Sequence, residues 1–201
     1  MKRFALIMFL VMAFSVSASA EGMIFGAKGG LNLAKVYGDD VDESDFLYGG
    51  IGGAFFCYMV NDMFAVQPEL LFAMKGGDQV TSGDETGKTK LNYIEIPVLL
   101  RLHIPTEGSL TPAVFAGPSI GFLMSAKFED EDIKDDLKST DFGLVVGAGL
   151  DHMLGENGGF ITFDVRYSMG LSTVVDIEGV DEQPDVKNMG LAFMVGYGKS
   201  F

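Results

Sequence analysis

Eight segments of the chain alternate large apolar residues with small or polar residues, and this period of two limits the fold more than any other feature. Successive side chains of a β-strand point to opposite faces, so each segment predicts a strand with one apolar face. The segment 160–172 shows the pattern most clearly, with one parity apolar and the other polar: Ile161, Phe163, Val165 and Tyr167 against Thr162, Asp164, Arg166 and Ser168. The predicted strands cover residues 23–35, 46–60, 64–74, 91–103, 112–124, 142–152, 160–172 and 188–201.

Two of these segments depart from strict alternation. The second is apolar on both parities, so the sequence leaves open which of its faces points outward. In the fifth, Phe115 places a large ring on the parity that otherwise carries small residues. Pro68, Pro97 and Pro118 also fall inside predicted strands, where proline removes a hydrogen bond of the ladder, and local bulges are the expected accommodation.

The connections between the segments alternate between short and long. An even number of strands, joined by short turns at one end and long loops at the other, is the pattern of bacterial outer-membrane barrels. The sequence therefore predicts an all-β chain that folds as an eight-stranded antiparallel up-and-down transmembrane β-barrel, with both termini in the periplasm. Short connections lie near Asn61, Glu107 and Glu156, and long ones near Asp40, Asp84, Asp132 and Asp181.

Alternation by itself would also suit a water-soluble β-sandwich, but the composition of the two parities favours the membrane. On the clearer segments the large apolar parity carries no charge until Lys199, near the final residue, where a lysine costs about 0–1 kcal/mol instead of about 2–4 kcal/mol at the bilayer midplane. The opposite parity is mostly glycine, alanine and serine, with few of the lysines and glutamates that cover a soluble surface. Many of the 27 glycines lie inside these segments, where they leave room in a narrow barrel.

The first 20 residues have the three parts of a secretory signal peptide. Lys2 and Arg3 precede an apolar run over 4–14, and Ala18-Ser19-Ala20 forms a small-residue cleavage site. We therefore expect a cleavable signal peptide over 1–20 and one outer-membrane β-barrel domain over 21–201. The apolar run is shorter than the about 20 residues of a transmembrane helix, and a buried N-terminal helix of a cytoplasmic protein is the alternative interpretation.

Charge and cysteine content argue against several classes of function. The net charge is −14, and removal of Lys2 and Arg3 makes it −16, which disfavours nucleic acid as a partner because phosphate binding needs a basic patch. Cys57 is the only cysteine, so the chain can form no internal disulfide and no Cys-rich metal site. No H-E-x-x-H pattern is present, and we expect no catalytic residues, no cofactor and no metal site. A membrane-embedded hydrolase is the hypothesis that the residues support least.

Six charged residues lie on the parity predicted to face inward. They could form a charged permeation path, or they could pair as salt bridges that fill a lumen only wide enough for side chains. We favour the second interpretation, because three charges of each sign suggest mutual pairing, whereas a selective filter favours one sign. The predicted network consists of Lys28, Glu69, Glu95, Arg101, Asp164 and Arg166.

The predicted long loops are rich in Asp and Glu, and the two histidines, His103 and His152, fall beside short turns. Carboxylates could bind divalent cations, but these acidic residues lack the fixed spacing of an EF-hand. We therefore interpret the loops as a solvated, self-repelling surface near the lipid headgroups. The histidines are interpreted as residues of the periplasmic rim.

The last segment contains Tyr197 and ends on Phe201, and it resembles the recognition signal that the barrel-assembly machinery reads in outer-membrane proteins. The rest of the chain resembles the outer-membrane β-barrel family that includes PorT-like proteins. The resemblance lies in four stretches: 26–33 (GAKGGLNL), 67–72 (QPELLF), 93–100 (YIEIPVLL) and 116–119 (AGPS). It implies the same barrel fold and says little about activity, because members of the family differ in function.

We therefore expect an integral outer-membrane protein of a Gram-negative cell envelope, with a structural, adhesive or assembly role and no catalytic activity. The alternative is a narrow, porin-like transport protein of the outer membrane. The expected partners are outer-membrane lipid and, during insertion, the barrel-assembly machinery. Partners among other envelope proteins cannot be named from the sequence.

Overall fold

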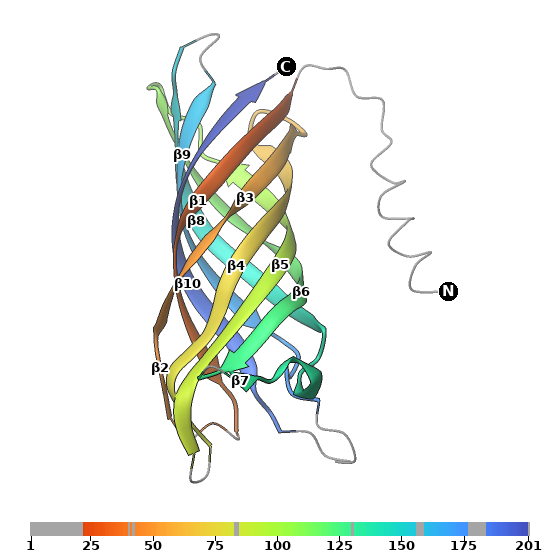
Figure 1. Cartoon of the computed structure of the whole chain (residues 1–201). Helices are drawn as coiled ribbons and strands as arrows, with labels where there is room; N and C mark the ends of the chain where they lie inside the picture. Colours follow the sequence, from red (N-terminus) through yellow and green to blue (C-terminus); the bar gives the residue numbers. More distant parts are fainter. Residues whose placement is uncertain are drawn as a thin grey trace, which may run out of the picture.

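In the computed structural model, eight long antiparallel strands pair in chain order around a barrel (Figure 1). The structure describes residues 22–39, 41, 43–82, 85–129, 131–155, 159–176 and 184–200. The strands of the wall are β1 (Met23–Tyr37), β3 (Leu47–Met59), β4 (Phe64–Ser82), β5 (Glu85–His103), β6 (Leu110–Phe128), β8 (Thr140–Met153), β9 (Phe160–Gly170) and β10 (Lys187–Ser200). Two short strands, β2 (Glu43–Asp45) and β7 (Glu131–Asp132), and the 3-10 helix η1 (Lys134–Asp136) complete the described elements.

The barrel closes where the first strand pairs with the last. β1 and β10 are antiparallel neighbours from Ile24 opposite Ser200 to Tyr37 opposite Lys187, without a break in register. Each other wall strand pairs with the strand before it and the strand after it. The prediction of an eight-stranded antiparallel up-and-down barrel is therefore confirmed. Closure removes the unpaired edges that an open sheet would expose.

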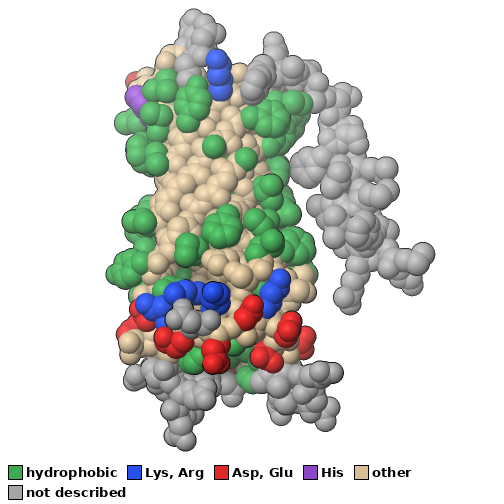
Figure 2. Space-filling model, in the orientation of Figure 1, with side chains coloured by type: hydrophobic (Ala, Val, Ile, Leu, Met, Phe, Trp, Pro, Cys, Tyr) green, Lys and Arg blue, Asp and Glu red, His purple; other side chains and the backbone are tan. Residues whose placement is uncertain are grey.

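The large apolar residues face outward and the charged residues face inward, which is the reverse of a soluble protein. On β5, Leu100 is 54% exposed while its neighbour Arg101 is 2% exposed, and on β9, Phe163 is 54% exposed while Asp164 is 2% exposed. On the face drawn in Figure 2, the wall between the two ends of the barrel shows hydrophobic side chains and backbone, and the charged side chains lie near the ends. An apolar exterior around a polar interior is the arrangement of an outer-membrane barrel. No helix in the described part of the chain is long and apolar enough to cross a bilayer.

The structure settles the facing of the second predicted strand. On β3, the side chains of Ile51, Phe55 and Cys57 are buried inside the barrel, whereas Tyr48 is 75% exposed on the outer wall. Alternation could not decide between these faces because both contain apolar residues. The lumen at this level accepts large apolar side chains, so inward residues of β3 are as hydrophobic as outward ones.

The three prolines inside strands are accommodated without bulges. Pro68 lies beside a two-residue gap in the β3–β4 ladder, Pro97 beside a gap in β4–β5, and Pro118 beside a gap in β5–β6. The register is the same on both sides of each gap, so our expectation of a local bulge was wrong. Each proline keeps its ladder pairing with the strand on its other side, so the missing N–H opens only one of the two ladders.

The connection predicted as a long loop near Asp84 is mostly strand. β4 and β5 continue as a paired hairpin to Ser82 and Glu85, beyond the apolar part of the wall. Lys88 and Asp78 form an ion pair of 3.0 Å across this extension. The prediction failed because the extension is hydrophilic on both faces, so it lacks the alternation that marks a half-buried strand.

Both ends of the described wall, Met23 and Ser200, lie at the end of the barrel that also contains the turns at 60–63 and 104–109 (Figure 1). The β4–β5 extension, β2 and β7 lie at the opposite end. The predicted connections at Asp40, Asp181 and Glu156 fall partly outside the described residues. In bacterial outer-membrane barrels the short turns face the periplasm, so the extended hairpin would face the cell exterior.

This orientation predicts which engineered cysteines are accessible from outside intact cells. In a Cys57→Ala background, Asp132→Cys at the loop end should react with a membrane-impermeant maleimide, because the loop end faces the medium. Asp62→Cys, in a short turn, should react only after the outer membrane is permeabilised. Labelling of both positions in intact cells would contradict the assigned orientation.

Candidate functional site

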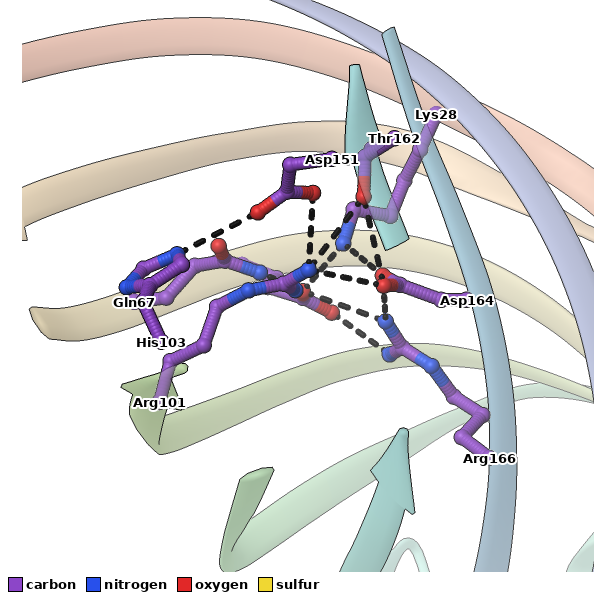
Figure 3. A network of polar contacts seen from close by, with 9 residues as sticks. Lys28, Gln67, Arg101, His103, Asp151, Thr162, Asp164 and Arg166 are labelled. Carbon is purple, nitrogen blue, oxygen red and sulfur yellow. Dashed lines mark hydrogen bonds and ion pairs between the residues drawn. The ribbon is translucent and has the colours of Figure 1, made fainter. Parts of the chain in front are cut away.

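The lumen contains a network of buried charges contributed by five strands. Lys28 from β1 lies between two carboxylates: its Nζ is 2.8 Å from Glu69 Oε1 of β4 and 2.7 Å from Asp164 Oδ2 of β9. These three side chains are at most 1% exposed. We use the name lumen network for this group, which Figure 3 draws: Lys28, Gln67, Glu69, Arg101, His103, Asp151, Thr162, Asp164 and Arg166.

Two arginines complete the pairing of the carboxylates. Arg166 contacts Glu69 with both terminal nitrogens, at 2.7 Å and 3.2 Å, and reaches Asp164 Oδ2 at 3.3 Å. Arg101 Nη2 lies 3.1 Å from Asp164 Oδ1 and 3.0 Å from Asp151 Oδ1. The network therefore holds three basic side chains and three carboxylates, each in contact with an opposite charge. Such mutual pairing offsets the large cost of burying isolated ions.

A glycine makes room for this packing. Gly149 of β8 lies directly opposite Asp164 of β9. A Cβ atom at Gly149 would come within 2.5 Å of both Arg101 Nη2 and Asp164 Oδ1. The interior therefore supports the expectation that lumen glycines provide space, and here the space is taken by an ion pair.

Phe115, which broke the sequence alternation, points into the lumen and supports the arginines. Its ring centroid is 5.2 Å from the guanidinium carbon of Arg101 and 5.5 Å from that of Arg166. The ring packs with Leu99 and Val145 on the inner wall. A cation can interact favourably with an aromatic face, so an apolar residue suits this position inside a charged lumen.

Five of the six residues predicted for the lumen lie in this network, but Glu95 does not. Glu95 Oε1 is 2.5 Å from Lys75 Nζ, which is also 3.7 Å from Asp141 Oδ2. Asn188 donates a hydrogen bond of 3.0 Å to the same Asp141 oxygen. Glu95 therefore belongs to a second cluster, closer to the loop end, with two carboxylates for one lysine. The interpretation of the six charges as one network was wrong in this respect.

The sequence interpretation missed Lys75, Asp141 and Asp151. Lys75 and Asp141 each lie one residue beyond the end of a predicted strand, so they were assigned to loops. Asp151 lies on the inward parity of its segment, and a search of that parity for charges would have found it. Strand ends are the least certain part of an assignment from periodicity, so residues at the ends of the lumen are the ones most easily lost.

The histidines and the predicted assembly residues lie away from the centre of the network. His103 is buried near the short-turn end of the lumen, with Nε2 3.2 Å from Asp151 Oδ2. His152 is half-buried on the neighbouring strand. Tyr197 lies on the outer wall and is 46% exposed. Phe201 lies outside the described residues.

A catalytic pattern occurs in the sequence without its structural context. The residues 117–121 (GPSIG) match G-x-S-x-G, a pattern of serine hydrolases, although we expected no catalytic residues from the sequence. A nucleophile elbow needs its serine on a tight turn between a strand and a helix, whereas Ser119 lies in the middle of β6, opposite Pro97 and Gly143. Within the described part of the chain, no three His, Cys, Asp or Glu residues are grouped to hold a metal.

The lumen network predicts a specific loss and recovery of stability. Asp164→Asn removes the one carboxylate of the network that touches all three basic residues, so three buried cations are left to share Glu69 and Asp151. This excess of buried positive charge should cost about 3–5 kcal/mol of unfolding free energy. Lys28→Met added to Asp164→Asn restores charge balance and should recover part of that loss. Urea unfolding in lipid vesicles measures both variants, and equal destabilisation by the single and double substitutions would contradict the assigned pairing.

Comparison with solved structures finds the same architecture in known outer-membrane proteins. Neisserial surface protein A matches 90% of this chain and 98% of its own length, with 17% identity and a TM-score of 0.57. Outer Membrane Protein W of E. coli matches 90% of this chain and 98% of its own, with 14% identity and a TM-score of 0.56. At such identities the likeness concerns the fold alone.

Comparison of the sequence with family models gives the family. No curated protein matches the sequence. The model described as outer membrane protein beta-barrel domain matches residues 17–176, which is most of the chain. This match agrees with the closed barrel and its apolar exterior. The chain therefore belongs to the outer membrane protein beta-barrel domain family, and it is an integral protein of the outer membrane.

Proposed function

We propose that this protein is a sealed outer-membrane barrel that acts through its surface and loops, in a structural, adhesive or assembly role. The observation that carries the proposal is the lumen network, which joins side chains from opposite walls across the interior (Figure 3). It has no catalytic activity in this proposal.

The charge pattern of the network supports sealing over conduction. A pore that selects ions presents rings of one sign, whereas here three basic residues and three carboxylates contact one another. Their side chains are at most 8% exposed, so they face each other and not an open channel. An eight-stranded barrel has an interior that side chains can fill.

A narrow, porin-like transport protein remains the second candidate. The observation in its favour is the cluster of Lys75, Glu95 and Asp141, where two carboxylates share one lysine. An excess of one sign in the outer half of the lumen would suit weak cation selection. Passage would still require the lumen network to open.

Electrical recording distinguishes these two functions. Purified protein in a planar bilayer should show no steady, single-size conductance, because paired side chains fill the lumen. Heat-dependent mobility on a gel serves as the control that the sample is a folded barrel. Stable channels with cation preference would overturn the sealed-barrel proposal in favour of transport.

We further propose that the protein is related to PorT-like proteins and that it reaches the outer membrane by export and assisted insertion. Three of the resembling stretches supply charged residues of the lumen: 26–33 contributes Lys28, 67–72 contributes Glu69, and 93–100 contributes Glu95. The N-terminal pattern over 1–20 supports export by a signal peptide that is then removed. The barrel-assembly machinery would then recognise the C-terminal strand.

Deletion of Phe201 tests the assembly role. The truncated chain should insert more slowly and accumulate with periplasmic chaperones, because the apolar alternation of the last segment would lose its aromatic end. Phe201→Tyr is the matched control and should insert at the normal rate. Pulse-chase measurement of heat-modifiable barrel in the outer membrane follows both, and normal insertion of the deletion variant would remove Phe201 from the signal.

A further inference from the structure

Lysines follow the apolar outer wall at the loop end of the barrel. On β1, β5, β6 and β10, a lysine stands on the outward parity near the loop end of the strand, and another precedes β8 by two residues. On the face drawn in Figure 2, basic side chains gather next to the hydrophobic wall at this end. We use the name lysine collar for this set: Lys35, Lys90, Lys127, Lys138 and Lys187.

The opposite end of the barrel lacks such a set. Among the described residues there, Lys199 is the only lysine or arginine on the outer wall. Of the other basic residues of the wall strands, Lys88 lies in the β4–β5 extension at the loop end, and Lys28, Lys75, Arg101 and Arg166 face the lumen. The difference in basic residues between the two ends of the barrel therefore lies on the outer surface, where the two bilayer leaflets contact the protein.

Two members of the collar face each other directly. Lys90 of β5 and Lys127 of β6 are partners in the antiparallel register, and both point outward. Side chains directly opposite on one face begin about 4.5–5.5 Å apart, and like charges in this position are destabilising. Lys88 and Lys187, in contrast, each have an acidic partner, Asp78 at 3.0 Å and Asp185 at 2.6 Å. Neither Lys90 nor Lys127 forms an ion pair with any residue that the structure describes. Asp132 of β7 is the register partner of Lys127 on its other side, and its Oδ1 accepts a hydrogen bond of 3.0 Å from the backbone N–H of Lys134.

The surface beneath this pair changes polarity in steps. Ile94 and Met124 belong to the apolar wall, and Met124 is 54% exposed. The next outward pair is polar: Asn92 donates a hydrogen bond of 2.8 Å to Ser125 Oγ. The two lysines follow. A bilayer has the same order of groups from its centre to its surface: hydrocarbon first, then neutral polar groups, then phosphates.

We propose that Lys90 and Lys127 bind the phosphate of a phosphorylated lipid in the outer leaflet. The phosphate would lie between the two ammonium groups and neutralise their mutual repulsion, while the acyl chains would lie along Met124 and the apolar wall. Lys35, Lys138 and Lys187 continue the same boundary around the barrel. The site lies on the outer wall, so it holds whether or not the lumen conducts.

The absence of tryptophan from the chain allows a direct measurement. Met124→Trp places a single fluorescent donor beneath the lysine pair, and energy transfer to dansyl-labelled lipid A in phosphatidylcholine vesicles reports local enrichment of that lipid. Bisphosphorylated lipid A should be enriched beside the donor, and the dephosphorylated form should not. Inorganic phosphate in the buffer should compete poorly, because it lacks the acyl chains.

Substitution of the lysines decides the proposal. Lys90→Gln with Lys127→Gln should remove the enrichment, with about a fivefold loss for each lysine. Arginine at both positions should retain it, and Lys88→Gln, which alters a lysine already paired with Asp78, should leave it unchanged. Enrichment that survives the double glutamine substitution, or that is equal for dephosphorylated lipid, would overturn the proposal. The single variant Lys127→Gln, at an exposed position, gives the same test if the double variant does not fold.

Discussion

The whole structure depends on the requirement that backbone N–H and C=O groups be hydrogen-bonded wherever lipid surrounds the chain. A bilayer offers no water to an unpaired strand edge, so a sheet in a membrane must close. Closure is achieved by β1 and β10, which pair from Ile24 to Tyr37 without interruption. The prolines are a limited exception to this hydrogen-bonding requirement. Each opens a gap of two residues in one ladder while the other ladder stays paired.

Closure with eight strands has a direct consequence for the interior. The lumen is only wide enough for side chains, so polar residues that face inward must satisfy one another. Asp164 contacts Lys28, Arg101 and Arg166, and Gly149 leaves the space in which the Arg101 contact forms. The aromatic ring of Phe115 fills the space beside the arginines. The same set of inward side chains therefore both fills the lumen and pairs its charges. A filled lumen leaves the outer surface and the loops as the parts available for function.

The outer surface divides into regions that match the layers of a membrane. Large apolar residues occupy the middle, and the lysine collar lies at the loop end, where acidic residues such as Asp132, the register partner of Lys127, also lie. The lysines and the acidic residues make two different kinds of contact. Lysines near the bilayer attract lipid phosphates, whereas acidic loops remain solvated above them.

The sequence alone predicted a membrane barrel, because most of the predicted strands place large apolar residues on one parity and small or polar residues on the other. It also identified Lys28, Glu69, Arg101, Asp164 and Arg166 as inward residues. Only the tertiary structure decided which inward charges touch, separating Glu95 into a cluster with Lys75 and showing that Lys90 and Lys127 stand opposite each other. Parity fixes the face of a residue within one strand, but contact across a lumen depends on the relative register and tilt of several strands. Those quantities arise from closure of the whole barrel, and no single segment contains them.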